Sequence, residues 1–155
     1  MQITYTQFQK SQSQETYVLI KTLYDELIAP EFNEQGKAEF LKYIAPEHIA
    51  QRQEQEHFII LAKDGEKIVG MIEIREPNHV SLLFVDKNYH NLGISRNLFA
   101  TAKEKIFHEN PDIKEISVNS SLYAVKAYER LGFVQVGEQS TFNGITFVPM
   151  KYLLS

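Results

Sequence analysis

The sequence has 155 residues, of which 43% are hydrophobic and 23% charged, and it contains no cysteine. This length suits one compact domain over residues 1–155, which buries roughly two thirds of the surface of the unfolded chain. The absence of cysteine excludes disulfides, thiolate metal sites and a cysteine nucleophile, and the formal net charge of −4 argues against a nucleic-acid-binding protein. No stretch is apolar enough to span a membrane, and the first residues lack a signal-peptide pattern. We therefore expect a cytoplasmic protein with no nucleic-acid or membrane partner.

The first third of the sequence predicts one short strand followed by helices. Residues 1–8 alternate weakly between apolar and polar, as in a strand. Apolar residues then recur at helical spacing over 14–29 and 34–44, a shorter polar helix is expected over 47–55, and Pro30 and Pro46 separate the three segments.

Acidic residues outnumber basic ones between residues 11 and 57. Solvated helix faces commonly have this composition. The alternative interpretation is a surface that attracts a cationic substrate. Its acidic residues include Glu31, Glu34, Glu47, Glu54 and Glu56.

The pattern then changes to that of strands. The segments HFIILA and KIVGMIEIRE flank a turn centred on Asp64-Gly65, and HVSLLFV follows the turn EPN, so we expect an antiparallel meander. Apolar residues over 94–107 predict a long helix that ends near residue 110. A strand KEISV, a helix over 122–131 closed by Gly132, and the strands FVQVGEQSTF and ITFVPMKYLL across Asn143-Gly144 complete the chain.

The order of these elements predicts an α/β (or α+β) domain with a mixed sheet. A helix connects LLFV to KEISV, and such a connection is a right-handed crossover between parallel strands. The meander and the hairpin across Asn143-Gly144 should be antiparallel, so the sheet is mixed.

The stretch DKNYHNLGISRN, residues 86–97, lies between a parallel strand and the long helix. Ligands of open α/β sheets bind at such places, and the free N–H groups of a helix N-terminus favour an anion. Gly93 permits a positive φ or a close approach of a ligand, and Ser95 is small. An ordinary strand-to-helix turn is the alternative. The stretch contains neither a P-loop nor a dinucleotide-binding fingerprint.

A second motif, NSSLYAVKAYERLGF, covers residues 119–133. Asn119 ends a short strand, and Ser120 or Ser121 is placed to cap the following helix. Ala124 and Tyr128 are four residues apart and share one helix face. Taken alone, the tyrosine is equally well explained as part of the core.

Taken together, the two motifs resemble the GNAT family of N-acetyltransferases. The family's loop reads Gln or Arg, two residues, Gly, one residue, then Gly or Ala, after a strand that ends in Val; here VDKNYHNLGIS supplies Val85, His90, Gly93 and Ser95. The family's second motif has Asn at a strand end and a helix with A-x-x-x-Y followed by L-G-F, as in NSSLYAVKAYERLGF. His90 and Ser95 depart from the usual residue types. The resemblance implies a mostly antiparallel central sheet of six to seven strands flanked by helices.

The resemblance also implies a co-substrate, acetyl-CoA, and a set of binding residues. The loop amides would hold its pyrophosphate, the strand segment at Phe84 and Val85 would pair with the pantetheine arm, and Asn119 would contact that arm from the other side. Tyr128 would protonate the departing thiolate as general acid. The expected cofactor-binding residues are Phe84, Val85, His90, Asn91, Leu92, Gly93, Ile94, Ser95, Arg96, Asn119, Ala124 and Tyr128.

The general base is less defined by the sequence. Glu73 interrupts an apolar strand and His79 opens the next strand, so both are candidates, and a water relay is a further alternative. A structural role for Glu73 at the exposed edge of a half-buried strand is the competing interpretation. The five histidines show no metal-binding spacing, so no metal is expected.

The leading hypothesis is therefore an enzyme that transfers an acetyl group from acetyl-CoA to a primary amine of a small molecule or peptide, by direct attack in a ternary complex. A CoA-binding sensor or partner-binding module without turnover is the alternative. Acetylation of charged tRNA, known in some toxin relatives, fits poorly with the negative net charge. The resemblance also leaves a homodimer open.

Overall fold

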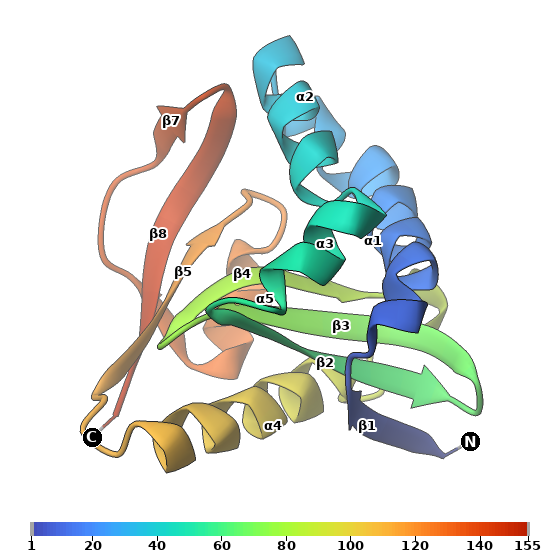
Figure 1. Cartoon of the computed structure of the whole chain (residues 1–155). Coiled ribbons are helices and arrows are strands. Elements are labelled where there is room, and N and C mark those ends of the chain that lie inside the picture. The colour runs from blue at the N-terminus through green and yellow to red at the C-terminus, as the bar shows by residue number, and fades with distance from the viewer. Residues whose placement is uncertain (1, 155) are drawn as a thin grey trace.

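A computed structural model describes residues 2–154 of the chain (Figure 1). Its sheet has the strand order β1-β2-β3-β4-β5-β8-β6, and β7 pairs with β8. Every neighbouring pair is antiparallel except β4 and β5. This is the mixed, mostly antiparallel sheet that the element order predicts.

The N-terminal part contains β1 (Ile3–Gln7) and three α-helices. These are α1 (Ser13–Leu27), α2 (Glu34–Tyr43) and α3 (Pro46–Arg52), with short 3-10 turns η1 (Lys10–Gln12) and η2 (Ala29–Glu31) beside α1. Asn33 caps α2 by accepting a hydrogen bond from the Gly36 N–H, and Pro46 opens α3 at a position that needs no donor. The predicted strand included Met1, which lies outside the described residues. The third helix ends at Arg52, three residues before its predicted end.

The predicted meander is present as β2 (His57–Asp64), β3 (Lys67–Arg75) and β4 (His79–Val85). Asp64 pairs with Lys67, so the two-residue turn is Gly65-Glu66, one residue beyond its predicted centre. Gly65 has a φ of 62°, which glycine adopts without strain. The meander forms the centre of the sheet.

The short 3-10 turn η3 (Lys87–Tyr89) and α4 (Ile94–Glu109) connect β4 to β5 (Glu115–Ser120). The two strands are parallel, as expected, but only His79 with Ser117 and Val80 with Val118 are paired. Beyond Val80 the strands separate. This separation opens the cleft that contains the candidate site.

The C-terminal part differs from the sequence prediction at two places. The last helix, α5 (Val125–Leu131), starts three residues late because the Ala124 N–H bonds to Ser121 in a turn. The predicted strand over 133–142 is two strands, β6 (Phe133–Gln135) and β7 (Ser140–Phe142), which both pair with β8 (Ile145–Leu153). The break lies opposite Pro149, which has no N–H for the ladder. The sheet therefore has eight strands rather than six to seven.

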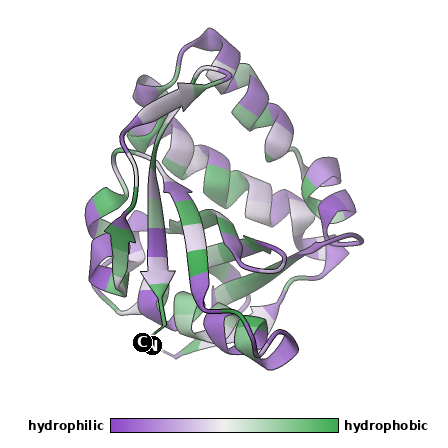
Figure 2. Ribbon diagram, turned by 90° about the vertical axis from the view of Figure 1, so that its left-hand side faces the viewer, coloured by the Kyte–Doolittle hydropathy of each residue, from purple (hydrophilic) through white to green (hydrophobic). Residues whose placement is uncertain are grey.

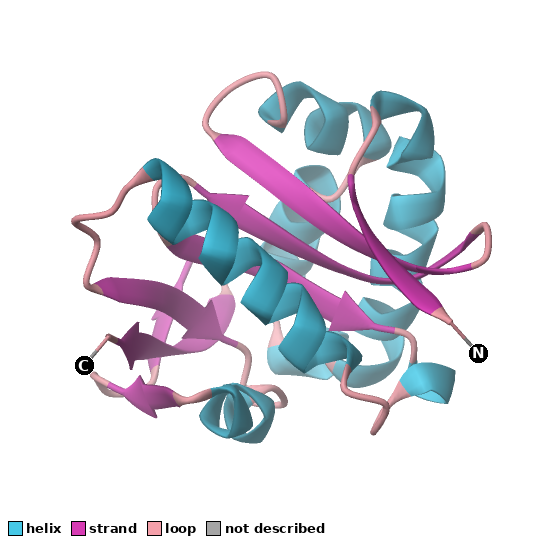
Figure 3. Ribbon diagram, turned by 90° about the horizontal axis from the view of Figure 1, so that it is seen from below, coloured by secondary structure: helices cyan, strands magenta, loops and turns pink. Residues whose placement is uncertain are grey.

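Helices cover both faces of the sheet. Helices α1 to α3 lie on one side and α4 on the other (Figures 1 and 3). One apolar cluster packs α4 against the sheet, and a second packs α1 and α3 against β2, β3 and β4. Apolar residues gather in the central strands, while the helices alternate between apolar and hydrophilic residues (Figure 2). No helix within residues 2–154 is long and apolar enough to cross a membrane.

Candidate active site

A cleft of about 970 Å³ lies where β4 and β5 separate. Its walls come from β4, the start of α4, β5, α5, the helices α1 and α2, and the β7–β8 hairpin. All the predicted cofactor-binding residues except Leu92 line this cleft, and so does His79; Glu73 does not. The topology thus brings the two sequence motifs into one site.

The loop between β4 and α4 is held in place by its own hydrogen bonds. The Asp86 carboxylate accepts from the Asn88 N–H, and the Tyr89 hydroxyl donates to Asp64 at 2.7 Å. The His90 ring is 2.8 Å from the carbonyl oxygen of Val85, so the ring folds back onto the loop. His90 therefore contributes to the shape of the loop.

Two residues of this loop have a positive φ. They are Asn91, at 67°, and Gly93, at 78°, which directly precedes α4. A Cβ on Gly93 would meet no atom within 4 Å, so the glycine is needed for its φ and leaves open space in front of the helix. The backbone at this point is accessible to a ligand.

The amides of residues 91 to 96 form a candidate anion site. Among residues 2–154, none of these six N–H groups donates to a protein acceptor. They lie at the positive end of a helix of 16 residues. Arg96, Lys126 and Arg130 also line the cleft and add positive charge. This arrangement fits a pyrophosphate group.

Asn119 and Tyr128 lie across the cleft from the loop, on β5 and α5. The Asn119 residue is exposed. Tyr128 is buried, its ring packs edge-on against Phe133 at 5.3 Å, and its hydroxyl has no hydrogen-bond partner within the described chain. Burial raises the pKa of this hydroxyl well above its usual range, so it is protonated at neutral pH. A protonated hydroxyl without a protein acceptor is available to donate to a ligand.

One edge of β4 is a feature that sequence reasoning missed. The β3–β4 register shifts between Glu73, opposite Leu82, and Ile74, opposite Val80, so Ser81 is an extra residue. Beyond Val80 the strand has no partner on the β5 side. Its backbone groups there face the cleft and can pair with an extended ligand. HVSLLFV reads as a regular strand, and no signal in the sequence marks the bulge.

Glu73 lies on β3 outside the cleft and is 0% exposed. Arg52 donates to both of its oxygens at 2.9 Å, Gln53 donates at 2.9 Å, and His57 lies at 3.0 Å. Burial raises the pKa of this carboxyl, but the hydrogen bonds from Arg52, His57 and Gln53 outweigh burial and hold it below its usual range. With its oxygens engaged, Glu73 is placed to join α3 to the sheet rather than to accept a proton from a substrate.

His79 lies at the cleft, with its Nδ1 atom 2.8 Å from the Ser117 hydroxyl. Burial, and then the nearby charge of Arg75, lower the pKa of His79 to about 4. The ring is therefore neutral at pH 7, and a pKa this low also makes it a weak proton acceptor. Of the two sequence candidates for the base, only His79 lines the cleft.

Two contacts join the helical part of the chain to its C-terminal part, and no local pattern predicted either of them. The Glu31 carboxylate accepts hydrogen bonds from the N–H groups of Leu122 and Tyr123, before α5. The Asn33 N–H donates to the carbonyl oxygen of Gly144, at the tip of the β7–β8 hairpin. Segments that are far apart in the sequence, and that each contribute walls of the cleft, are therefore held together.

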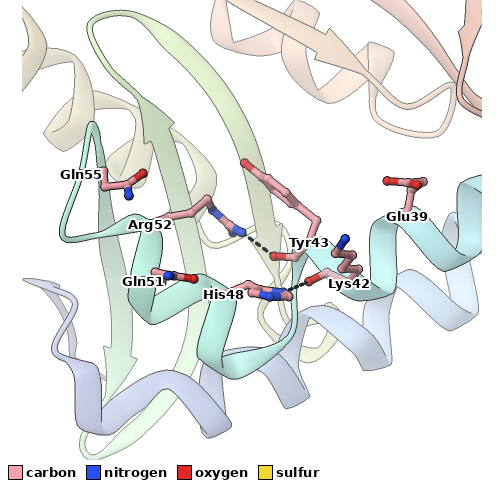
Figure 4. Close-up of a pocket in the computed structure, with 7 residues that line it drawn as sticks. All are labelled: Glu39, Lys42, Tyr43, His48, Gln51, Arg52 and Gln55. Carbon is pink, nitrogen blue, oxygen red and sulfur yellow. Dashed lines mark hydrogen bonds between the residues drawn. The ribbon is translucent and has the colours of Figure 1, made fainter.

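A smaller pocket of about 430 Å³ lies between α2 and α3 (Figure 4). The Arg52 guanidinium donates to the Tyr43 carbonyl and lies 3.6 Å from the centre of the Tyr43 ring. Tyr43 and Glu39 line both this pocket and the cleft. The buried Arg52–Glu73 pair thus holds a side chain that forms part of the cleft wall.

Of the acidic residues between 11 and 57, Glu39 lines the cleft, and the five named as a surface for a cationic substrate do not. Glu31, Glu34, Glu47, Glu54 and Glu56 are all absent from the lining of the cleft. Glu54 pairs instead with Lys10 at the surface. Within residues 2–154, no group of three or more His, Asp or Glu side chains is arranged to hold a metal ion.

Comparisons with known proteins agree with this geometry. The family model described as "Acetyltransferase (GNAT) domain" matches residues 28–154. No curated protein matches the chain. Solved structures with the same fold include a GCN5-related N-acetyltransferase from Rhodopseudomonas palustris, with a TM-score of 0.83 and 15% identity over 99% of this chain and 97% of that one.

Two other structures are similar over nearly their whole length. The PaiA N-acetyltransferase of Thermoplasma acidophilum, solved in complex with coenzyme A, has a TM-score of 0.80 and 13% identity over 99% of both chains. A GNAT-family acetyltransferase from Staphylococcus aureus has a TM-score of 0.76 and 20% identity over 99% of this chain and 100% of that one. The family model identifies an acetyltransferase domain, and the fold and the cleft agree with it. The chain belongs to the GNAT family of acetyl-CoA-dependent N-acetyltransferases.

Proposed function

We propose that this protein transfers the acetyl group of acetyl-CoA to a primary amine of a small molecule or peptide, by direct attack in a ternary complex. The observation that carries the proposal is that one cleft is lined both by the loop whose amides at residues 91–96 are free and by the free Tyr128 hydroxyl. The first feature suits the phosphates of the donor, and the second suits its departing sulfur. The PaiA structure contains coenzyme A in the same fold.

The cleft offers a separate place for each part of the donor. The amides of residues 91–96, with Arg96 at the helix start, would hold the pyrophosphate. The free edge of β4 at Phe84 and Val85 would pair with the amides of the pantetheine arm, and Asn119 would contact the arm from β5. His90 acts through the loop backbone, because its ring bonds to Val85.

The chain's residues then support a single displacement. The amine nitrogen attacks the thioester carbonyl carbon, the carbon–sulfur bond breaks, and the sulfur takes the Tyr128 proton. No cysteine exists to carry the acetyl group, so an acetyl-cysteine intermediate is excluded. The amine must lose a proton, which His79 accepts directly or through water. Glu73 is not assigned this role, since Arg52, Gln53 and His57 occupy its oxygens.

We also propose that residues 1–155 act as one domain in the cytoplasm. Because the chain has no cysteine, its stability does not depend on disulfides, which form in oxidising compartments and are rare in the cytoplasm.

Release of free thiol from acetyl-CoA in the presence of a panel of primary amines tests the reaction. We expect Tyr128→Phe to lower turnover by about 10²-fold or more, within the range of acid–base groups, and to leave CoA binding, measured by calorimetry, nearly unchanged. Tyr17→Phe, at a tyrosine outside the cleft, is the matched control and should retain full turnover.

Two results would contradict the proposal. If CoA raises the melting temperature but no amine is acetylated, the protein is a CoA-binding module without turnover. If Tyr128→Phe keeps wild-type turnover, the general acid is another group. Mass spectrometry of the product distinguishes acetyl transfer from simple hydrolysis of the thioester.

A further inference from the structure

The part of the cleft opposite the anion site has mostly apolar and aromatic walls. We call this part the acceptor end; its side chains include Leu27, Phe32, Phe40, Tyr43, Phe142 and Phe147. Phe32 and Phe40 pack against Tyr24 in a fixed aromatic cluster, with ring centres 4.3 to 5.9 Å apart. An acceptor that fills this end displaces water from apolar surface, so the walls favour an apolar body.

Among residues 2–154, only two side chains at the acceptor end carry a charge at neutral pH, Glu39 and Arg75. The other cations of the cleft, Arg96, Lys126 and Arg130, come from α4 and α5, on the side of the anion site. Arg75 ends β3 and pairs across the sheet with His79. It therefore lies next to the point where β4 and β5 begin to separate.

The Arg75 guanidinium has no ion-pair or hydrogen-bond partner within residues 2–154. Every carboxylate in a described ion pair bonds to another cation, and Glu73, on the same strand, is taken by Arg52. Arg75 is exposed to the cleft rather than packed against an acid. A guanidinium in this position matches the planar geometry of a carboxylate, which it binds through two parallel hydrogen bonds.

We infer that the acceptor is an amine with an apolar body and a carboxylate, as in an apolar α-amino acid, and that Arg75 binds this carboxylate. The inference rests on the proposed function, because the amine must reach the acetyl group beside Tyr128. This acceptor differs from the basic amine that the acidic composition of residues 11–57 suggested. Among the described residues, Glu39 is the only acidic side chain that lines the cleft. A polyamine would leave its further ammonium groups without partners there.

A paired set of acceptors tests the inference. L-Phenylalanine and phenethylamine share the aromatic body and the amine, and only the first has a carboxylate; spermidine represents the polycationic alternative. We expect wild-type kcat/KM to be at least about 10-fold higher for L-phenylalanine than for phenethylamine, given the strength of charged hydrogen bonds. Spermidine should be the poorest of the three.

The variant Arg75→Gln assigns the effect to this residue. It should lower kcat/KM for L-phenylalanine by about 10- to 100-fold, mainly through KM. The fold-change for phenethylamine should be at least about 5-fold smaller, because a change in the pKa of His79 acts on both amines and only L-phenylalanine loses a partner for its carboxylate. Arg75→Lys keeps the charge without the planar fork and should recover part of the loss. Lys114→Gln, which removes an exposed charge outside the cleft, is the control and should leave both values unchanged.

The outcomes separate this inference from the proposed function. Preference of the wild type for phenethylamine or spermidine, or an equal effect of Arg75→Gln on both aromatic amines, overturns the inference while the reaction stands. If no amine releases thiol, calorimetry with N-acetyl-L-phenylalanine, the product that transfer to L-phenylalanine would form, decides. Binding to the wild type that is lost in Arg75→Gln supports the inference, and no binding to the wild type overturns it.

Discussion

Gly36 of α2 and Gly144 of the β7–β8 hairpin meet backbone to backbone. A Cβ on Gly36 would lie 2.2 Å from the Gly144 carbonyl oxygen, which also accepts the Asn33 N–H at 3.2 Å. The hairpin carries Phe142, which is 70% exposed and lines the cleft. This close contact between two glycines therefore sets where the hairpin lies over the acceptor end.

We predict that Gly36→Ala displaces the hairpin and weakens binding of the acceptor. Gly36 has no positive φ, so alanine adds no backbone strain and acts only through the contact with Gly144. Forcing a methyl group into a packed contact costs about 1–3 kcal/mol of unfolding free energy. We expect KM for the acceptor to rise several-fold while CoA affinity is retained, as measured by steady-state kinetics and calorimetry.

The control for this variant is Gln35→Ala, at an exposed position of the same helix. It should leave both the urea unfolding curve and KM unchanged. If Gly36→Ala behaves like Gln35→Ala, the glycine contact does not position the hairpin.

The buried pair of Arg52 and Glu73 leads to a prediction about stability. Removing one partner from a buried ion pair leaves an unpaired charge and typically costs about 3–5 kcal/mol. Arg52→Ala should therefore lower the free energy of unfolding by that order, measured by urea denaturation. It also removes the guanidinium that lies on the Tyr43 ring. The double variant Arg52→Met with Glu73→Met should be less destabilised than Arg52→Ala, since it leaves no charge unpaired.

The exposed pair of Lys10 and Glu54 provides a comparison for this experiment. Both side chains are largely exposed, and surface pairs are worth about 0–1 kcal/mol. Lys10→Ala should thus be nearly neutral. If Arg52→Ala lowers the free energy of unfolding as little as Lys10→Ala does, water reaches the Glu73 carboxylate and the ion pair does not join α3 to the sheet.

Local signals in the sequence predicted much of the fold, including the loop that precedes α4. The apolar spacing indicated the helices, the Asn143-Gly144 turn indicated the last hairpin, and Gly93 indicated the loop before α4. Each of these features is determined by a few residues that are neighbours in the chain, so a local sequence pattern predicts it. The roles of Asn119 and Tyr128 came from the resemblance of the two motifs to the GNAT family.

The acceptor side depends on contacts between residues far apart in the chain, which local patterns do not contain. The sequence pattern makes Glu73 a candidate base, but in the fold Arg52, 21 residues earlier in the chain, donates a hydrogen bond to its carboxylate. Glu31 reaches Leu122 and Tyr123, more than 90 residues away. The break opposite Pro149 arises from a proline on the neighbouring strand rather than on the broken one.

The titration of His79 provides a test of the charge environment at the acceptor end. Burial lowers the pKa of His79 from 6.5 to about 4, and the positive charge of Arg75 contributes to the shift. Because a cation disfavours a second cation, Arg75→Gln should raise this pKa. The pH titration of the His79 ring protons by NMR measures the pKa in the wild type and in the variant.

The sign of the effect on stability follows from the same shift. In the unfolded chain His79 binds a proton near pH 6.5, whereas the folded protein resists protonation until about pH 4. The unfolded state therefore binds more protons between these values, and this contribution to stability is lost as pH falls from about 6.5 to about 4. Arg75→Gln should make the loss smaller, and Lys114→Gln should not alter it. A wild-type pKa near 6.5 would show that the ring is solvated, and would remove the reason to expect a neutral base at this position over the whole range from pH 5 to 8.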